Sequence, residues 1–182
     1  MSVSHLKRLI LETMWVLDKP TKAMDIAKET GLGFPTAMMH IIGLTRMGFA
    51  ESPEKGYYTI TRNGKKALGF PEIDKEKAAE ILAYLPLEKS FRFYADMGKP
   101  LGIHAASLQD FCDKIPKVDV GAIEFHIYRG DFEAWFMSMG DVELARKTLL
   151  IREQKMRGED LRSKFREIVK NRFEELDKTR KT

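Results

Sequence analysis

The stretch DIAKETGLGFPTAMMHIIGLTRMGFAES, residues 25–52, decides the fold of the N-terminal half. It predicts a short helix that Gly31 closes, and then a helix that begins at Phe34-Pro35-Thr36 and stops at Gly48. Proline suits the first turn of a helix because its missing N–H would have no intrahelical acceptor there. Glycine commonly ends a helix because it adopts the left-handed conformation without strain. The stretch therefore predicts two helices joined by a short turn.

An amphipathic pattern precedes this stretch. Ser4 is the expected N-cap of a first helix, because a serine hydroxyl can accept a hydrogen bond from a free N–H of the first turn. The apolar face of that helix consists of Leu6, Leu9, Ile10, Thr13, Met14 and Leu17. Thr21 is expected to cap the second helix, whose inward-facing residues are Met24, Ile26 and Ala27. Three short helices in this order make up the start of the chain.

Two strand patterns follow the third helix. Residues 49–51 and Tyr57–Ile60 predict strands, and the turn-rich residues 52–56 between them predict the tip of a hairpin. Tyr58 and Ile60 are expected to point inward, since alternate side chains of a strand share one face. Thr61 is expected to cap a short helix after the hairpin. Helix, helix, turn, helix and hairpin in this order are the pattern of a winged helix-turn-helix.

The 25–52 stretch also resembles the middle of small bacterial and archaeal winged-helix regulators. Its hydrophobic-Ala-x-x-x-Gly and Leu-x-x-x-Gly-hydrophobic places are filled by Ile26, Ala27, Gly31, Leu32, Ile41, Leu44, Gly48 and Phe49. The run YYTITRNGKKAL, residues 57–68, resembles the Tyr-x-Leu-Thr-x-x-Gly sequence that follows the wing in MarR- and PadR-like proteins. The resemblance covers residues 5 to about 70. It implies a transcriptional regulator that binds double-stranded DNA.

In such regulators the start and outer face of the third helix enter the major groove. The base-edge candidates here are Thr36, Met39 and His40, and the phosphate candidates are Lys55, Arg62, Lys65 and Lys66. No Arg, Lys, Asn or Gln stands where a bidentate base contact would be made, and Phe34, Met38 and Ile42 make the outer face apolar. The alternative hypothesis is therefore a protein–protein adapter whose apolar third helix docks a partner without sequence-specific DNA binding.

The composition of the 182-residue chain limits its chemistry. The 31 Lys and Arg against 27 Asp and Glu give a formal net charge of +4, which is mildly basic. A single cysteine, Cys112, cannot form an internal disulfide or build a structural zinc site alone. No apolar run predicts a membrane span, and the charged N-terminus is not typical of a secretory signal. We therefore expect a cytoplasmic protein without a metal, a cofactor or a membrane partner.

Residues 73–85 predict a helix, capped by Asp74, that connects two domains. These domains are a winged helix-turn-helix at residues 1–72 and a helical C-terminal domain at residues 86–182. The expected caps of the C-terminal helices are Ser107, Asp131 and Asp141. Residues 118–128 are apolar and favour strand and helix equally. The sequence thus predicts a mainly α protein with a small β-wing.

Residues 107–149 resemble a small domain of uncharacterised archaeal and bacterial proteins. The shared patterns are Ser-Leu-x-x-Phe, Glu-Phe-His-x-x-Arg-Gly-Asp-Phe-x-x-Trp and Gly-Asp-x-Glu-Leu-Ala. A catalytic base at His126, oriented by Asp131, would need both side chains to converge in one pocket, and we expect no catalytic role. The candidate residues of a pocket for a small-molecule effector are Phe93, His126 and Trp135. The alternative is that these aromatic residues fill a helical core.

Gly158 is expected to separate the last two helices. The final helix carries an apolar stripe of Leu161, Phe165, Ile168, Val169, Phe173 and Leu176 on a surface rich in Arg, Lys and Glu. Such a stripe must be buried, either within its own domain or against a second copy of the chain. Because winged-helix regulators commonly read two half-sites as dimers, we expect a homodimer through the C-terminal helices.

Overall fold

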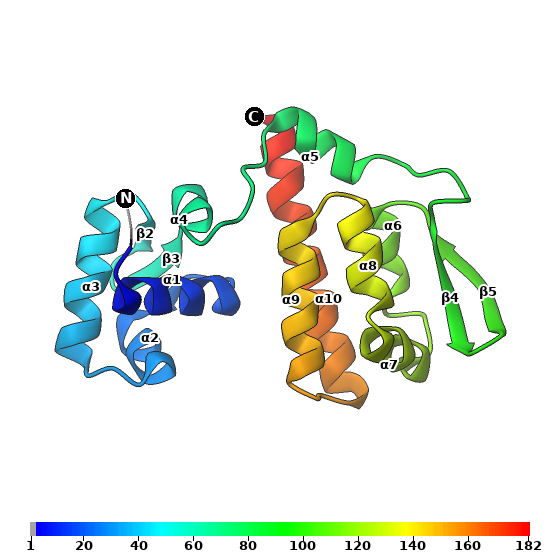
Figure 1. The fold of residues 1–182 in the computed structure, drawn as a ribbon, viewed down its shortest axis with the longest axis horizontal. Helices are drawn as coiled ribbons and strands as arrows, with labels where there is room; N and C mark the ends of the chain where they lie inside the picture. Colours follow the sequence, from blue (N-terminus) through cyan, green and yellow to red (C-terminus); the bar gives the residue numbers. More distant parts are fainter. Residues whose placement is uncertain (1–2) are drawn as a thin grey trace. The chain divides into compact units, whose positions relative to one another are not determined.

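The computed structural model describes residues 3–182. This part of the chain is 62% helical, with ten helices and a small antiparallel sheet. The chain divides into two compact units (Figure 1): the first ends at Glu72 and the second runs from Ile73 to Thr182. Residues 73–85, which we expected to connect two domains, therefore belong to the second unit. Within the described residues no helix is both long and apolar enough to cross a membrane.

The first unit contains four helices and a three-stranded antiparallel sheet in the order β1-β3-β2. Its elements are α1 (His5–Leu17), β1 (Thr21–Lys22), α2 (Ala23–Thr30), α3 (Phe34–Arg46), β2 (Ala50–Glu54), β3 (Tyr57–Ile60) and α4 (Arg62–Ala67). Helices α1, α2 and α3 contact one another, and β2 packs beside α3. The predicted order of helices and hairpin is therefore present, together with one further short strand, β1.

Three details of the first unit differ from the sequence prediction. The buried face of α1 is Ile10, Leu11, Met14 and Trp15, so the face is rotated from the predicted one. The buried face includes the indole of Trp15, which packs on Phe70 with ring centroids 4.7 Å apart. Thr21 lies in β1 and Lys22 is the N-cap of α2, so Thr21 is not the cap. Met24 is exposed rather than inward-facing.

The predicted hairpin is present, but β2 runs to Glu54, so residues 52–54 belong to the strand and not to the turn. The glycine and threonine signals on either side of the hairpin are confirmed. Gly31 ends α2 with a φ of 69°, in the left-handed region. The Thr61 hydroxyl accepts a hydrogen bond from the Gly64 N–H at 3.1 Å and donates one to the Gly48 carbonyl at 2.6 Å. A Cβ at Gly64 would lie 2.2 Å from the carbonyl oxygen of Phe49. The start of α4 thus lies against the backbone of Gly48 and Phe49, which follow α3. This close packing requires the hydroxyl of Thr61 and the absence of a side chain at Gly64.

The second unit contains six helices and a two-stranded hairpin. Its elements are α5 (Lys75–Leu82), β4 (Phe91–Asp96), β5 (Lys99–Ala105), α6 (Leu108–Lys114), α7 (Val120–Arg129), α8 (Asp131–Ser138), α9 (Val142–Glu153) and α10 (Gly158–Lys181). Asp74, Ser107 and Asp141 cap their helices as predicted. Residues 118–128, which favoured strand and helix equally, form most of α7.

The β4–β5 hairpin corrects the expectation of a purely helical C-terminal domain. Phe91 and Phe93 are buried while Arg92 between them is exposed, which is the period-two pattern of a half-buried strand. The turn between the strands contains Gly98, with a φ of 69°. Because the inward-facing residues of β4 are aromatic, the hairpin is fixed to the helices through side chains as well as through strand pairing.

The apolar stripe of α10 is buried within its own unit. Leu161, Phe165 and Val169 are fully buried, and Phe165 stacks on Phe132 of α8 with ring centroids 4.8 Å apart. Helix α5 also packs against α10. The stripe that suggested a dimer thus forms the centre of the second unit's core.

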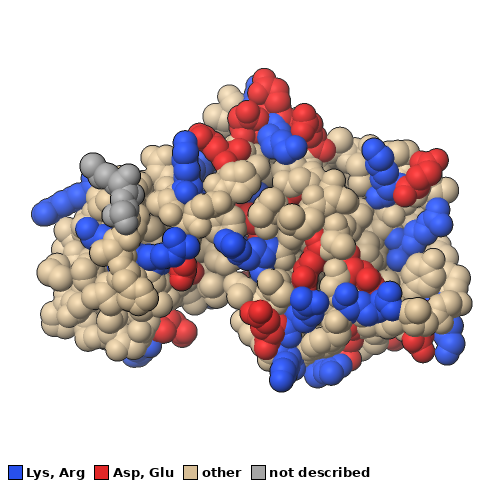
Figure 2. All heavy atoms as spheres, viewed as in Figure 1, with Lys and Arg blue, Asp and Glu red and all other residues tan. Residues whose placement is uncertain are grey.

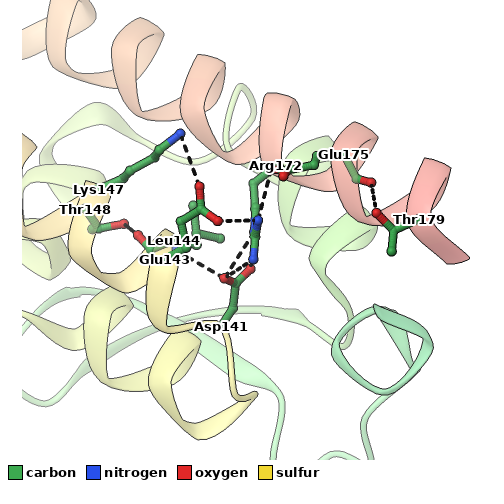
Figure 3. A network of polar contacts seen from close by, with 8 residues as sticks. All are labelled: Asp141, Glu143, Leu144, Lys147, Thr148, Arg172, Glu175 and Thr179. Atoms are coloured by element: carbon green, nitrogen blue, oxygen red, sulfur yellow. Dashed lines mark hydrogen bonds and ion pairs between the residues drawn. The ribbon is translucent and has the colours of Figure 1, made fainter. Parts of the chain in front are cut away.

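A network of buried charges joins α9 to α10 (Figure 3). Arg172, only 3% exposed, donates to Asp141 at 2.9 Å and to Glu143 at 2.7 Å, and also bonds Glu175 on its own helix. Glu143 lies 3.9 Å from the ammonium of Lys147. Burial alone would lower the pKa of Arg172, but attraction from Asp141, Glu143 and Glu175 outweighs it and raises that pKa. The Gly-Asp-x-Glu pattern of the sequence is therefore explained by helix capping and by this ion network.

Candidate functional site

The first candidate site is the outer face of α3. Ala37, Ile41 and Leu44 are fully buried and fix the helix on the first unit. The opposite face is exposed, and Met39 at its centre is 62% exposed. Thr36 is exposed as well, whereas His40 is half-buried at the edge of this face. Of the three base-edge candidates, Thr36 and Met39 thus face solvent fully and His40 only in part.

The exposed face of α3 is apolar and slightly hollowed. The hollow is lined by Phe34, Pro35, Met38, Met39, Ile42, Gly43 and Arg46. Arg46 places a cation at its C-terminal end. The side chain of Lys7 adds a second, since a Cβ at Gly43 would lie 3.3 Å from its Cε. The apolar part of α3 is therefore flanked by positive charge from its own C-terminus and from α1.

The phosphate candidates lie around the hairpin and on α4. Lys55 is exposed in the turn between β2 and β3, and Arg62 is exposed at the start of α4. Lys66 bonds Glu72 at 3.0 Å on the surface, and Lys65 is half-buried. An exposed ion pair such as Lys66–Glu72 contributes little free energy, so a phosphate could replace its carboxylate. Basic and acidic side chains are interspersed on the face of the molecule in Figure 2.

The second candidate site is the predicted effector pocket of the second unit. Two of its three predicted residues, Phe93 and Trp135, lie in the aromatic core and do not line the cavity described below. Phe93 and Trp135 are buried in an aromatic cluster around Phe91 and Phe111 rather than lining a cavity. The Trp135 indole N–H donates to the Lys89 carbonyl at 2.9 Å, which satisfies its polar atom. These two residues therefore follow the alternative that aromatic side chains fill the core.

His126 lines a cavity in the second unit, and both of its ring nitrogens are bonded. Its Nε2 accepts from the Tyr94 backbone N–H at 2.8 Å, and its Nδ1 lies 2.8 Å from Asp131 Oδ2. Because Nε2 acts as an acceptor, the proton of the neutral ring must be on Nδ1, which donates to Asp131. Burial lowers the pKa of His126, and the hydrogen bond and charge of Asp131 only partly oppose this. A neutral imidazole with both nitrogens bonded has no free lone pair for a general base.

The cavity around His126 has a volume of about 270 Å³ and lies between the β4–β5 hairpin and α7. It is lined by Phe91, Arg92, Tyr94, Asp96, Met97, Gly98, Phe125, His126, Arg129 and Asp131. Asp96, Met97 and Gly98 at the tip of the hairpin were not expected at this cavity because the sequence did not predict the hairpin. The alternation of Phe91, Arg92, Phe93 and Tyr94 was the available signal, since it is the strand period.

Other polar residues of the 107–149 pattern have structural partners. Glu124 accepts a hydrogen bond from the Gly158 N–H at 2.6 Å and thereby holds the start of α10. Asp131 was expected to cap α8, but its side chain makes no cap bond and instead contacts His126 and Arg129. Burial raises the pKa of the Cys112 thiol to about 12, so this cysteine is not a reactive thiolate near neutral pH.

Comparison of the chain with protein-family models, with curated proteins and with solved structures gave no match. Any function therefore has to be argued from the residues and surfaces described above.

Proposed function

We propose that the first unit is a winged helix-turn-helix that binds double-stranded DNA and regulates transcription. In this proposal α3 enters the major groove and the β2–β3 turn carries Lys55 to the phosphate backbone. The supporting observation is the exposure of α3: its inner face is fully buried, its outer face is open, and β2 of the hairpin packs beside it. A helix presented in this way has the geometry that groove binding requires.

The side chains on α3 favour affinity over sequence specificity. The Thr36 hydroxyl is a donor and acceptor for a base edge, whereas Met39 offers an apolar contact to a thymine methyl group. Lys7, Arg46 and Lys55 are cations for phosphates. Because phosphate contacts supply affinity without reading sequence, binding should depend strongly on salt and weakly on base composition.

A duplex-binding titration at several salt concentrations tests this proposal. Lys55→Ala should weaken binding and reduce the slope of log K against log salt by about one unit, because one phosphate contact is lost. Lys117→Ala is the matched control, since Lys117 is an exposed lysine in a loop of the second unit. Duplex affinity that is negligible at physiological salt, or equal losses in both variants, would overturn the proposal.

The apolar hollow on α3 favours a second candidate function, a protein–protein adapter. Phe34, Met39 and Ile42 expose apolar surface that binding to an apolar partner segment would remove from water. In that case Met39→Asp should abolish complex formation with the partner, and the duplex titration should show no binding.

The expected homodimer is a separate question. Since the stripe of α10 is buried inside the second unit, the DNA-binding proposal in its simplest form uses one copy of the chain. A mass measured by light scattering, with and without a duplex, tests whether two copies assemble. A dimer would predict half-sites about 34 Å apart, which is one turn of B-DNA.

A further inference from the structure

The cavity in the second unit has aromatic walls and two guanidinium groups. Phe91 and Phe125 supply apolar surface, and Arg92 and Arg129 come from β4 and α7. Its volume of about 270 Å³ is close to the lower end of the range for small-molecule sites. A ligand that fits must therefore be small.

The contacts of Arg129 leave its terminal N–H groups with a poor acceptor. Its Nε donates to Asp131 at 3.1 Å, while Nη1 contacts the thioether sulfur of Met97 in the hairpin turn. The guanidinium carbon lies 5.0 Å from the centre of the Phe125 ring, within the range of a cation–π contact. A thioether is a weak hydrogen-bond acceptor. A carboxylate that displaced the Met97 sulfur would form a charge-assisted hydrogen bond with Arg129, and arginine and carboxylate commonly pair in this way with bidentate geometry.

The charged side chains that line the cavity balance in number, with Arg92 and Arg129 against Asp96 and Asp131. Asp131 is bonded by Arg129 and by His126, and Asp96 lies 3.8 Å from Lys99 and accepts from the Met97 N–H at 2.7 Å. Both carboxylates thus already have partners. The Arg92 guanidinium and the terminal N–H groups of Arg129 are therefore the charged groups of this cavity that a ligand would meet, and they favour an anion.

The displaceable group is also exposed. Met97 is 68% exposed and stands next to Gly98 in the hairpin turn. Its side chain can rotate away into solvent without opening the core, because the residues that anchor the hairpin are Phe91 and Phe93. Access to Arg129 thus costs little packing.

We propose that this cavity binds a small organic carboxylate with a flat apolar body. The carboxylate accepts from the terminal N–H groups of Arg129 in place of the Met97 sulfur, Arg92 adds attraction, and the apolar body lies against Phe125. This proposal does not depend on DNA binding by the first unit, because every residue that it uses belongs to the second.

Titration with phenylacetate, followed by amide chemical shifts of the full chain, tests this proposal. Saturable shifts are expected at Tyr94, Gly98 and Phe125. Phenylacetamide, which has nearly the same shape without the charge, should bind roughly tenfold or more weakly, since charge-assisted hydrogen bonds are worth about 1.5–3 kcal/mol.

Two variants complete the test. Arg92→Gln should weaken phenylacetate binding several-fold without altering the fold, because Arg92 is an exposed strand residue. Arg157→Gln is the control. Like Arg129, Arg157 lies over an aromatic ring, 4.3 Å from the centre of Tyr128, and pairs with a carboxylate, that of Glu124, but it does not line the cavity. Equal binding of the acid and the amide, shifts spread outside the hairpin and α7, or unchanged binding by Arg92→Gln would overturn the proposal.

Discussion

The imidazole Nε2 of His126 accepts a hydrogen bond from the backbone N–H of Tyr94, 2.8 Å away. This bond ties α7 to β4 across 32 residues of sequence. It needs a neutral imidazole, because a protonated ring has an N–H at both nitrogens and cannot accept. One of the contacts that attach the hairpin to the helices therefore depends on the protonation state of His126, while the buried Phe91 and Phe93 supply others.

The first prediction concerns pH. Burial lowers the pKa of His126 in the folded protein below its ordinary value of about 6.5. The unfolded chain then binds more protons than the native state as the pH falls below about 6.5, so the contribution of His126 is complete above that pH and is lost below it. His126→Gln keeps an acceptor for Tyr94 and a donor for Asp131 without titrating.

Urea unfolding at pH 7.5 and pH 5.5 measures this effect. The native chain should lose more free energy of unfolding between these pH values than His126→Gln does. An equal loss in both proteins would show that His126 does not couple stability to pH.

The second prediction concerns the buried charges. Arg172→Met should lower the free energy of unfolding by about 3–5 kcal/mol, because Asp141 and Glu143 would remain buried without their main cation. Arg166→Met, at an exposed position of the same helix, should change it by less than about 0.5 kcal/mol. Chemical denaturation of both variants checks the difference, and similar small values would contradict the network's importance.

The third prediction concerns Gly64, the glycine in the first turn of α4. Gly64→Ala should destabilise the first unit by about 1–3 kcal/mol, since the new Cβ would overlap the Phe49 carbonyl oxygen. At Gly33, the N-cap of α3, an added Cβ meets no atom within 4 Å and the φ is −61°, so Gly33→Ala should cost only about 0.5–1 kcal/mol, which reflects the poorer capping of a helix by alanine. Thermal unfolding of the two variants makes the comparison.

The fourth prediction concerns the surface proposed to meet DNA. Met39→Lys should strengthen duplex binding and increase the salt slope by about one unit, because it adds a cation to the exposed face of α3. Met137→Lys is the matched control, since Met137 is also an exposed methionine on a helix but belongs to the second unit. If both variants gain equally, net charge rather than α3 governs the affinity.

The sequence predicted best what neighbouring residues determine. As helix caps, Gly31, Thr61 and Asp141 act within a few residues of their own positions, so these helix ends could be placed from the sequence, although the predicted caps Thr21 and Asp131 were wrong. The β4–β5 hairpin was missed because its alternating stretch is short and its burial depends on helices that follow much later in the chain.

The polar residues of the second unit were the harder part. Arg172 looks like one of many surface cations in a basic segment, and only the packing of α9 on α10 brings it to Asp141, 31 residues away. The sequence left open whether His126 and Asp131 converge, and the partner that occupies Nε2 is a backbone amide. Every residue except proline has a backbone N–H, so the amino-acid sequence does not indicate which of them bonds a side chain. The hydrogen bond of His126 to the hairpin could therefore not be predicted.

The Thr61 hydroxyl donates a hydrogen bond to the Gly48 carbonyl just after α3 and accepts one from the Gly64 N–H in α4. These two bonds hold the base of the β2–β3 hairpin closed. The turn at the tip is short, since β2 runs to Glu54 and β3 begins at Tyr57. Replacing Lys55, an exposed residue of this turn, should preserve the unit's folding while altering what the tip touches, which makes this position the natural place for engineering new binding preferences.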